Sequence, residues 1–301
     1  MNDLKKEIKE LAAEKDAVIL AHYYVNDEVQ EIADYVGDSF YLAKKAKELT
    51  NKVIVFCGVT FMGESACILS PEKTVLIPDG EAVCPMALMV DREEIQKMRD
   101  EYEDLAVVCY INSMAATKEL VDVCVTSSNA LKIVKNLPQK NIYFIPDKNL
   151  GSWIAQQVPE KNFIMGEGYC HVHEAIKPED VEKARAEHPG CKVLVHPECP
   201  IEVSNMADYA GSTSGIIEYA TNCDDKEFII GTEAGVRYEL EKRNPDKVFH
   251  FIEKEACADM HRMTLEDVAA CLRNNAPQAT LDEDVRIRAN KSLEKMLELA
   301  R

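Results

Sequence analysis

Residues 18–24 read VILAHYY, an apolar run typical of a strand buried on both faces of a parallel sheet, followed by polar or aromatic residues. The same form recurs as VVCYIN at residues 107–112 and as VLVHPE at residues 193–198. Each run is followed by a predicted helix, strand, helix and strand, and then by a cysteine: Cys84, Cys170 and Cys257. These cysteines are 86 and 87 residues apart, a period well beyond the roughly 20–50 residues of solenoid repeats. The chain is therefore predicted to contain three copies of one α/β unit.

This pattern predicts three α/β/α lobes with short parallel sheets, related by pseudo-threefold symmetry around a central site. The predicted repeats are residues 16–104, 105–189 and 190–281. A charged amphipathic helix is expected at residues 1–15 and a long charged helix at residues 282–301, the latter packed on the first lobe.

Composition excludes several classes of function. The 301 residues carry a net charge of −18, which opposes binding to nucleic acid or to anionic membranes. The sequence has no apolar run of membrane-spanning length and no signal-peptide core, so we expect a cytoplasmic protein. Its 11 cysteines, an odd number with no Cys-x-x-Cys pair, argue against a disulfide framework and against zinc ribbons.

The ends of the three leading strands carry groups suited to catalysis. Ligands of parallel α/β sheets bind outside the carboxyl ends of the strands, so these residues should meet around one cavity. Together they offer a general base, proton donors and groups that bind carbonyl oxygens. They are His22, Tyr24, Tyr110, Asn112, His196 and Glu198.

Hydroxyl residues recur at the predicted start of the helix after each leading strand, including Ser39, Ser127, Ser212 and Thr213. Serine and threonine are common N-caps, which is sufficient to explain any one of them. Three helix starts directed at one cavity would also bind phosphate or carboxylate groups. The pattern thus favours a polyanionic substrate.

Cys84, Cys170 and Cys257 each lie in a loop, where a thiol can ionise and bind metal. Zinc is one possibility, with His171 or His173 as fourth ligand. A [4Fe–4S] cluster with three thiolate ligands and one open iron is another. Packing explains the other eight cysteines better.

Short stretches along residues 21–260 resemble the quinolinate synthase family. They are AHYY (21–24), VGDS (36–39), PDG (78–80), YIN (110–112), TSSNA (126–130), IPD (145–147), HE (173–174), HPE (196–198), GSTSG (211–215), GTE (231–233) and CADM (257–260). The resemblance implies three lobes around an oxygen-sensitive [4Fe–4S] cluster. It also implies condensation of iminoaspartate with dihydroxyacetone phosphate to quinolinate, phosphate and two waters, in NAD biosynthesis.

The resemblance also implies residue roles. The cluster ligands would be Cys84, Cys170 and Cys257, and Glu198 would be the general base. His22 and Tyr24 would act near the triose carbonyl, and His196 would bind substrate beside Glu198. The residues that would hold carboxylate, phosphate or product groups are Ser39, Tyr110, Asn112, Ser127, His173, Ser212 and Thr213.

Two departures from the family pattern matter. His261 stands where many members have lysine, and the Cys-x-x-Cys redox pair of some bacterial members is absent. The expected partners are the two small substrates and an enzyme that produces iminoaspartate, and the expected assembly is a monomer or homodimer. Two alternatives remain: a three-cysteine iron–sulfur reductase of an isoprenoid diphosphate, and a non-catalytic zinc or iron–sulfur sensor.

Overall fold

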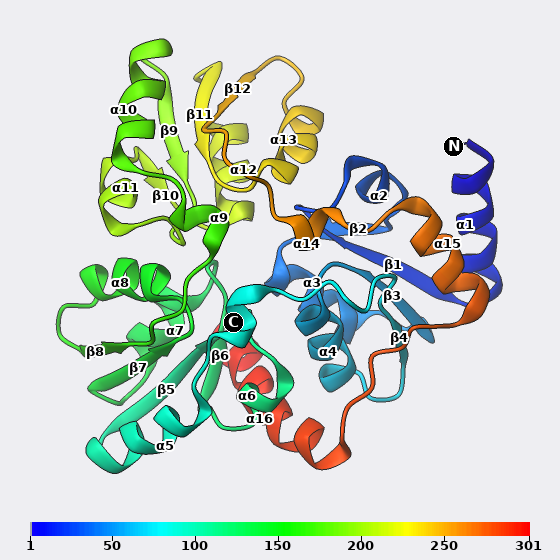
Figure 1. The fold of residues 1–301 in the computed structure, drawn as a ribbon, viewed down its shortest axis with the longest axis horizontal. Helices are drawn as coiled ribbons and strands as arrows, with labels where there is room; N and C mark the ends of the chain where they lie inside the picture. The colour runs from blue at the N-terminus through cyan, green and yellow to red at the C-terminus, as the bar shows by residue number, and fades with distance from the viewer. Residues whose placement is uncertain (1) are drawn as a thin grey trace.

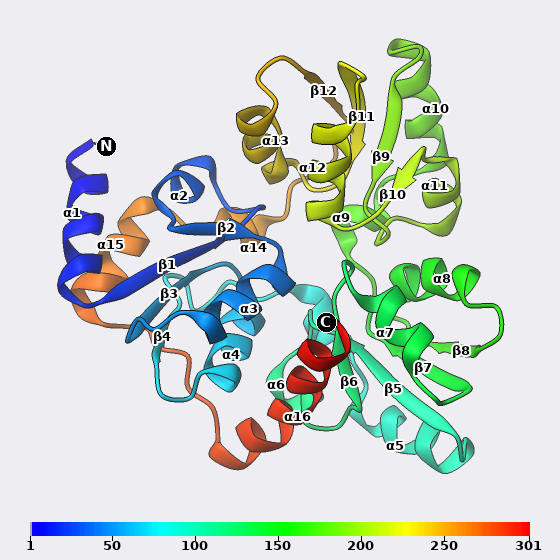
Figure 2. The same cartoon turned by 180° about the vertical axis from the view of Figure 1, so that it is seen from behind.

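The computed structural model describes residues 2–301, so Met1 of the predicted N-terminal helix lies outside the described residues. Three α/β/α lobes surround a common centre (Figure 1), and the view from behind shows the same arrangement (Figure 2). Each lobe contains one four-stranded parallel sheet. The strands are β1 Ala17–His22, β2 Tyr35–Gly37, β3 Val53–Cys57, β4 Thr74–Leu76, β5 Leu105–Tyr110, β6 Val123–Val125, β7 Asn141–Ile145, β8 Asn162–Met165, β9 Lys192–Val195, β10 Tyr209–Ala210, β11 Glu227–Gly231 and β12 Val248–Phe251.

The three sheets share one topology and one register. Their strand orders are β2-β1-β3-β4, β6-β5-β7-β8 and β10-β9-β11-β12. In each sheet the leading strand pairs with its short neighbour at an offset of 15 residues, as in Leu20 with Tyr35, Val108 with Val123 and Leu194 with Tyr209. Identical offsets across three sheets confirm the threefold repeat predicted from the sequence. The short strands β2 and β10 were not predicted.

The helices repeat in the same way. A helix precedes each leading strand, three α-helices connect the strands of each lobe, with the 3₁₀ helix η2 added before the last of them in the third lobe, and a short helix follows each last strand. They are α1 Asn2–Glu14, α2 Asp27–Ile32, α3 Ser39–Glu48, α4 Thr60–Leu69, η1 Pro85–Leu88, α5 Arg92–Glu101, α6 Ala115–Lys118, α7 Ala130–Asn136, α8 Lys148–Gln157, α9 His171–Glu174, α10 Pro178–Glu187, α11 Ile201–Met206, α12 Thr213–Asn222, η2 Ala234–Val236, α13 Arg237–Arg243, α14 Ala258–His261, α15 Leu265–Asn274 and α16 Glu283–Leu299.

A polar contact repeats in every lobe and secures the leading strand. An aspartate carboxylate accepts the N–H of the leading strand's third residue in the first two lobes and of its second residue in the third: Asp34 from Ile19, Asp122 from Val107 and Asp208 from Val193, at 2.7–2.8 Å. In each lobe a lysine ammonium also donates to carbonyl groups at the C-terminal end of a helix. Lys73 donates at the end of α3, Lys161 at the end of α7 and Lys247 at the end of α12. Cations are favourable at helix C-termini, so the sequence repeat preserves the electrostatics as well as the fold.

The C-terminal segment returns to the first lobe and then crosses to the second. Helix α15 contacts α1 and β3 of the first lobe. Helix α16 was predicted to pack on the first lobe, but it contacts β6, α6 and α7 of the second lobe as well as α4 of the first. Its buried face includes Leu293, Met296 and Ser292, and the Ser292 hydroxyl donates to the carbonyl of Lys118. The helix therefore joins two lobes.

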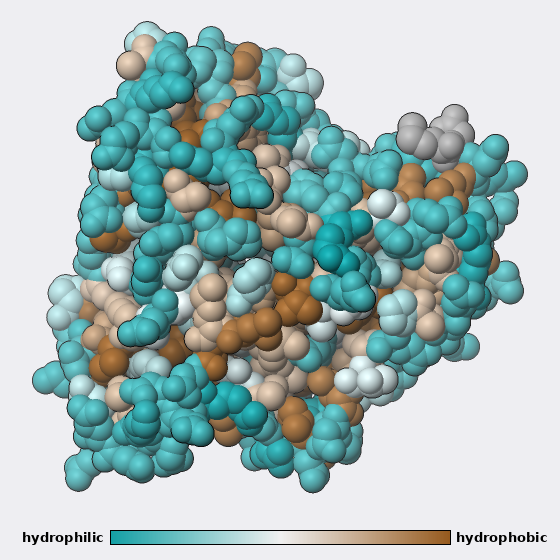
Figure 3. Space-filling view, viewed as in Figure 1, coloured by the Kyte–Doolittle hydropathy of each residue, from teal (hydrophilic) through white to brown (hydrophobic). Residues whose placement is uncertain are grey.

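The lobes are held together at the centre. Hydrogen bonds cross each of the three boundaries: Ala115 N–H to Glu64, Asn149 to the Glu198 carbonyl, and Ser214 to Asp38. Figure 3 shows polar residues over most of one face and apolar residues gathered near its middle, where the lobes meet. Among residues 2–301, no helix combines the length and apolar character needed to cross a membrane.

Candidate active site

A cavity at the meeting point of the lobes brings together nearly all of the residues proposed from the sequence. Its wall includes thirteen of the fourteen: His22, Tyr24, Ser39, Cys84, Tyr110, Asn112, Ser127, Cys170, His173, His196, Glu198, Thr213 and Cys257. The exception is Ser212, whose hydroxyl caps α12 by accepting the Gly215 N–H at 3.2 Å. The capping interpretation therefore accounts for Ser212.

The three cysteines occupy equivalent positions. Each one directly precedes the short helix after its lobe's last strand, and its carbonyl accepts an N–H from that helix: Cys84 from Ala87, Cys170 from Glu174 and Cys257 from His261. The thiols therefore share one local backbone geometry, and they meet because the three sheets direct their carboxyl ends to one centre.

Burial governs the ionisation of these thiols. It raises the pKa of Cys84 to about 12, with further contributions from the negative charges of Glu198 and Cys257. Burial also raises the pKa of Cys170, helped by Glu198 and Cys84, and raises that of Cys257. Backbone N–H groups at the helix starts act in the opposite direction at all three. A bound cation would complete the stabilisation of the thiolates.

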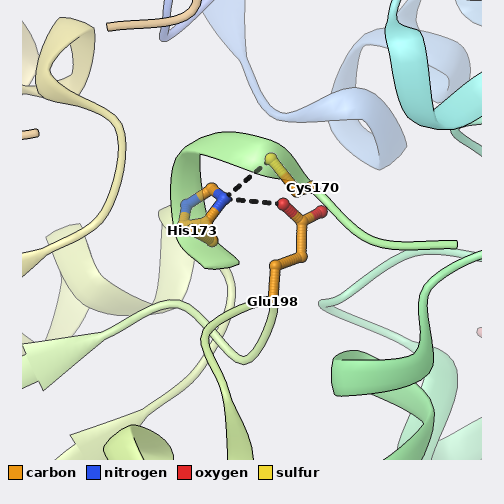
Figure 4. A group of neighbouring side chains, drawn as sticks. All are labelled: Cys170, His173 and Glu198. Atoms are coloured by element: carbon orange, nitrogen blue, oxygen red, sulfur yellow. Dashed lines mark hydrogen bonds and ion pairs between the residues drawn. The ribbon is translucent and has the colours of Figure 1, made fainter. Parts of the chain in front are cut away.

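Glu198 is the acidic centre of the cavity, and Figure 4 shows it with Cys170 and His173. Its carboxylate lies 2.8 Å from His173 Nδ1, which is also 3.2 Å from Cys170 Sγ. Donor atoms of these three residues all lie within 4.8 Å of one another, so the group could hold a metal ion. His171 is exposed, which leaves His173 as the histidine of the two that reaches the cavity.

The charge state of Glu198 follows from its neighbours. Burial alone would raise the pKa of Glu198, but His196, His173 and the Tyr110 phenol outweigh it and hold the pKa below its usual range. Burial, followed by the negative charge of Glu198, raises the pKa of Tyr110 and of Tyr24. Both tyrosines therefore stay protonated beside an ionised carboxylate.

His22 and His196 are held in the same neutral form. Each accepts a backbone N–H at Nδ1 from the residue two positions later: His22 from Tyr24 at 3.2 Å and His196 from Glu198 at 3.3 Å. The remaining proton of each neutral ring therefore lies on Nε2. Burial lowers the pKa of His22 to about 4 and that of His196 to about 3, and the Glu198 charge opposes this only in part.

A chain of hydrogen bonds crosses the cavity wall and joins all three lobes. His173 Nε2 lies 2.9 Å from the Thr232 hydroxyl, which lies 3.0 Å from the Tyr24 hydroxyl. Tyr24 in turn lies 2.6 Å from the hydroxyl of Thr213. With its proton on Nδ1, His173 donates to Glu198 and accepts from Thr232, so the chain links Glu198 to Tyr24.

No role was predicted for Thr232 or Glu233, although both belong to the GTE stretch at residues 231–233, one of the motifs noted in the sequence. Glu233 lines the cavity, is almost fully buried, and lies 2.9 Å from His261 Nε2. The bond to Glu233 raises the pKa of His261. His261 also contacts Asn26 at 2.9 Å, so it bridges the first and third lobes beside Cys257.

The helix-start hydroxyls differ from the prediction in the second lobe. Ser39 and Thr213 are the first residues of α3 and α12, but α7 begins at Ala130, three residues after Ser127. Asn129 accepts the Thr126 N–H and ends a turn there. Ser127 still reaches the cavity, with its hydroxyl 3.2 Å from His196 Nε2.

Comparisons with known proteins cover almost the whole chain. A family model described as quinolinate synthetase A protein matches residues 6–298. A protein of Caldicellulosiruptor saccharolyticus named quinolinate synthase is 53% identical over 298 residues, covering 99% of this chain and 98% of its own. Proteins of the same name from Fusobacterium nucleatum subsp. nucleatum and Clostridioides difficile are 52% and 50% identical, covering 99% of this chain and 99% and 98% of their own.

Proposed function

Because the chain belongs to the quinolinate synthase family and is an enzyme of that type, we propose that it condenses iminoaspartate with dihydroxyacetone phosphate in NAD biosynthesis. The products are quinolinate, phosphate and two waters. Atoms and electrons balance in this reaction without an external oxidant or reductant. The site must therefore bind two anions, move protons and assist the loss of phosphate and water.

The observation that carries the proposal is the convergence of three thiols and the strand-end acid–base groups on one cavity. Each lobe contributes one thiol, and each contributes side chains at equivalent strand ends. A sensor would need the thiols alone, whereas this cavity also contains an ionised buried carboxylate with two protonated phenols beside it.

We further propose that Cys84, Cys170 and Cys257 hold a [4Fe–4S] cluster. The donor set fits this group, since three thiols with matching backbone geometry face one space and gain support from helix N–H groups. When bound, such a cluster supplies an iron with an open position that acts as a Lewis acid toward a substrate oxygen.

In the proposed mechanism Glu198 removes protons from the condensing substrates. A base must be ionised at the working pH, and the low pKa of Glu198 meets this requirement. Once Glu198 holds a proton, it can donate that proton to Nδ1 of His173 while the Nε2–H of His173 donates to Thr232 and Thr232 donates to Tyr24, the reverse of the resting hydrogen-bond directions. Tyr24 then returns a proton at the triose carbonyl, where the Nε2–H of His22 also donates.

Anion binding in the cavity would rest on hydrogen bonds. Within residues 2–301, none of the side chains lining the cavity is lysine or arginine. The hydroxyls of Ser39, Ser127 and Thr213 and the N–H groups of α3 and α12 are donors suited to this role. The buried Oδ1 of Asn112 has no protein partner, which suits a substrate or product that donates to it.

The cellular setting follows from the substrates. Iminoaspartate hydrolyses readily as an imine, so we propose that an iminoaspartate-producing enzyme supplies it in the cytoplasm. A closed cavity between lobes would exclude the water that destroys the imine. The enzyme would act as a monomer or a homodimer.

An anaerobic assay tests this function. The iron-loaded protein is mixed with dihydroxyacetone phosphate and iminoaspartate formed in situ from oxaloacetate and ammonia. We expect equal amounts of quinolinate and phosphate, and no quinolinate from Cys170→Ala. Phosphate release without quinolinate, or no product from iron-loaded wild type, would contradict the proposal.

A further inference from the structure

A second group of metal-ligand side chains lies on the third lobe: Cys191 directly before β9, Glu227 at the start of β11 and His250 as the third residue of β12. Donor atoms of Cys191, Glu227 and His250 all lie within 4.8 Å of one another. His250 Nε2 is 3.0 Å from a Glu227 carboxylate oxygen. The proposed active site lies at the other end of this sheet. Gly231 lies four residues after Glu227 on β11, which is about 13 Å at the usual strand rise.

The register of the sheet fixes this arrangement. Ile229 on β11 pairs with Val193 on β9 and with His250 on β12. Glu227 and Cys191 each lie two residues before a member of this row, so all three side chains project from one face of the sheet. That face packs against α10 through a small apolar core that includes Val193, Ile229 and, at its edge, Cys191. Two adjacent strands and the residue that directly precedes a third strand therefore hold the donors together.

Neighbouring residues orient the imidazole. His188, at the end of α10, stacks on His250 with ring centroids 3.5 Å apart and an angle of 14°. This contact holds the His250 ring with Nε2 toward Glu227. Gly190, whose φ of +89° favours glycine, forms the turn that leads from His188 to Cys191.

The local charge favours a cation. Glu187 and Asp225 line the same surface depression as Cys191 and Glu227. Lys192 pairs with Asp225, and Lys226, which lines the same depression, pairs with Asp246, so Glu187 and Glu227 remain the acids not matched by these two ammonium groups. A chain with a net charge of −18 adds a general attraction for cations.

We propose that Cys191, Glu227 and His250 form a binding site for one zinc ion, with water completing the coordination. Sulfur, imidazole nitrogen and carboxylate oxygen are the ligand types of zinc, and a hard cation such as Mg²⁺ would not select the thiol. The bound ion would link strands β11 and β12 to the residue directly before β9. This role is structural and independent of the function proposed for the central cavity.

Zinc binding is tested on iron-loaded protein by anaerobic equilibrium dialysis against micromolar zinc, with zinc and iron measured together. Wild type should bind one more zinc than Cys191→Ala or His250→Gln, whose affinity should fall at least tenfold. Cys223→Ala changes another partly buried cysteine of the same lobe and should bind zinc like wild type. X-ray absorption of the wild-type zinc should show one sulfur neighbour at about 2.3 Å.

Iron content should be the same in all four proteins. Equal iron shows that the substitutions leave the central cysteines unaffected and that each variant is folded. Equal zinc binding by wild type and by His250→Gln would overturn the proposal, as would zinc bound without a sulfur neighbour. The His250 variant keeps the test decisive if Cys191→Ala does not fold.

Discussion

Thr232 offers the sharpest test of the proposed proton path. Among residues 2–301, its hydroxyl alone contacts both His173 Nε2, at 2.9 Å, and the Tyr24 hydroxyl, at 3.0 Å. Thr232→Val keeps the shape of the side chain and removes the hydroxyl. Thr232→Ser keeps the hydroxyl and removes a methyl group. The two variants therefore separate hydrogen bonding from packing.

The size of the effect follows from which groups lose a partner. Tyr24 keeps its 2.6 Å contact with Thr213, but His173 Nε2 is left buried without a donor. An unsatisfied buried polar group costs about 1–3 kcal/mol. If the loss falls on the transition state, kcat decreases about 5- to 150-fold, at about 1.4 kcal/mol per factor of ten.

The assay is anaerobic quinolinate formation, with iron content measured for each protein. Thr117→Val is the matched control, because Thr117 is 4% exposed, as is Thr232, but takes no part in the hydrogen bonds that link His173 to Tyr24. We expect the control to retain wild-type kcat and Thr232→Ser to retain most of it. A Thr232→Val enzyme as fast as Thr232→Ser would refute the proton path.

Three further predictions follow from the structure. Glu198→Gln should keep its iron, and its kcat should fall about 10²- to 10⁴-fold because the general base is lost. Glu239 is a buried acid of the same lobe that lies outside the cavity, so Glu239→Gln should stay active. Equal rates for the two variants would remove Glu198 from the base role. Burial lowers the pKa values of His22 and His196 to about 4 and 3 from an ordinary 6.5, so the unfolded chain binds more protons below pH 6.5 and stability should fall as pH falls from 6.5 to 4. His22→Gln should reduce that slope by up to about 1.4 kcal/mol per pH unit in urea unfolding, and unchanged slopes would contradict the assignment. Deletion of residues 283–301 uncovers apolar surface on two lobes. It should lower the melting temperature by at least about 10 °C, since several buried apolar side chains each contribute about 1.5–3 kcal/mol. A melting temperature like that of wild type would contradict the bridging role of α16.

The sequence was most informative where the fold repeats. Apolar runs and the cysteines at equal intervals predicted three lobes with their strand ends at one centre, because each repeat encodes the same local pattern. Strands β2 and β10 escaped prediction because they span only three and two residues, too few for a periodic signal. Their pairing depends on the neighbouring strand.

Other features depend on tertiary contacts that no local pattern encodes. Helix α16 was predicted as a helix from its charge pattern, but its bridging of two lobes depends on surfaces formed by distant segments. Thr232 gained its place in the site only when His173 and Tyr24, from the other two lobes, came within reach of its hydroxyl. Asn129 ends the turn that precedes α7, so Ser127 is not at the start of that helix.

The central claim is that three equivalent cysteines hold an iron–sulfur cluster in an enzyme of this family. Iron and acid-labile sulfide content under strict anaerobiosis tests it most directly. We predict about four iron and four sulfide per chain in wild type and in Cys223→Ala, and almost none in Cys170→Ala. Zinc without iron in wild type, or equal iron in Cys170→Ala and Cys223→Ala, would contradict the claim.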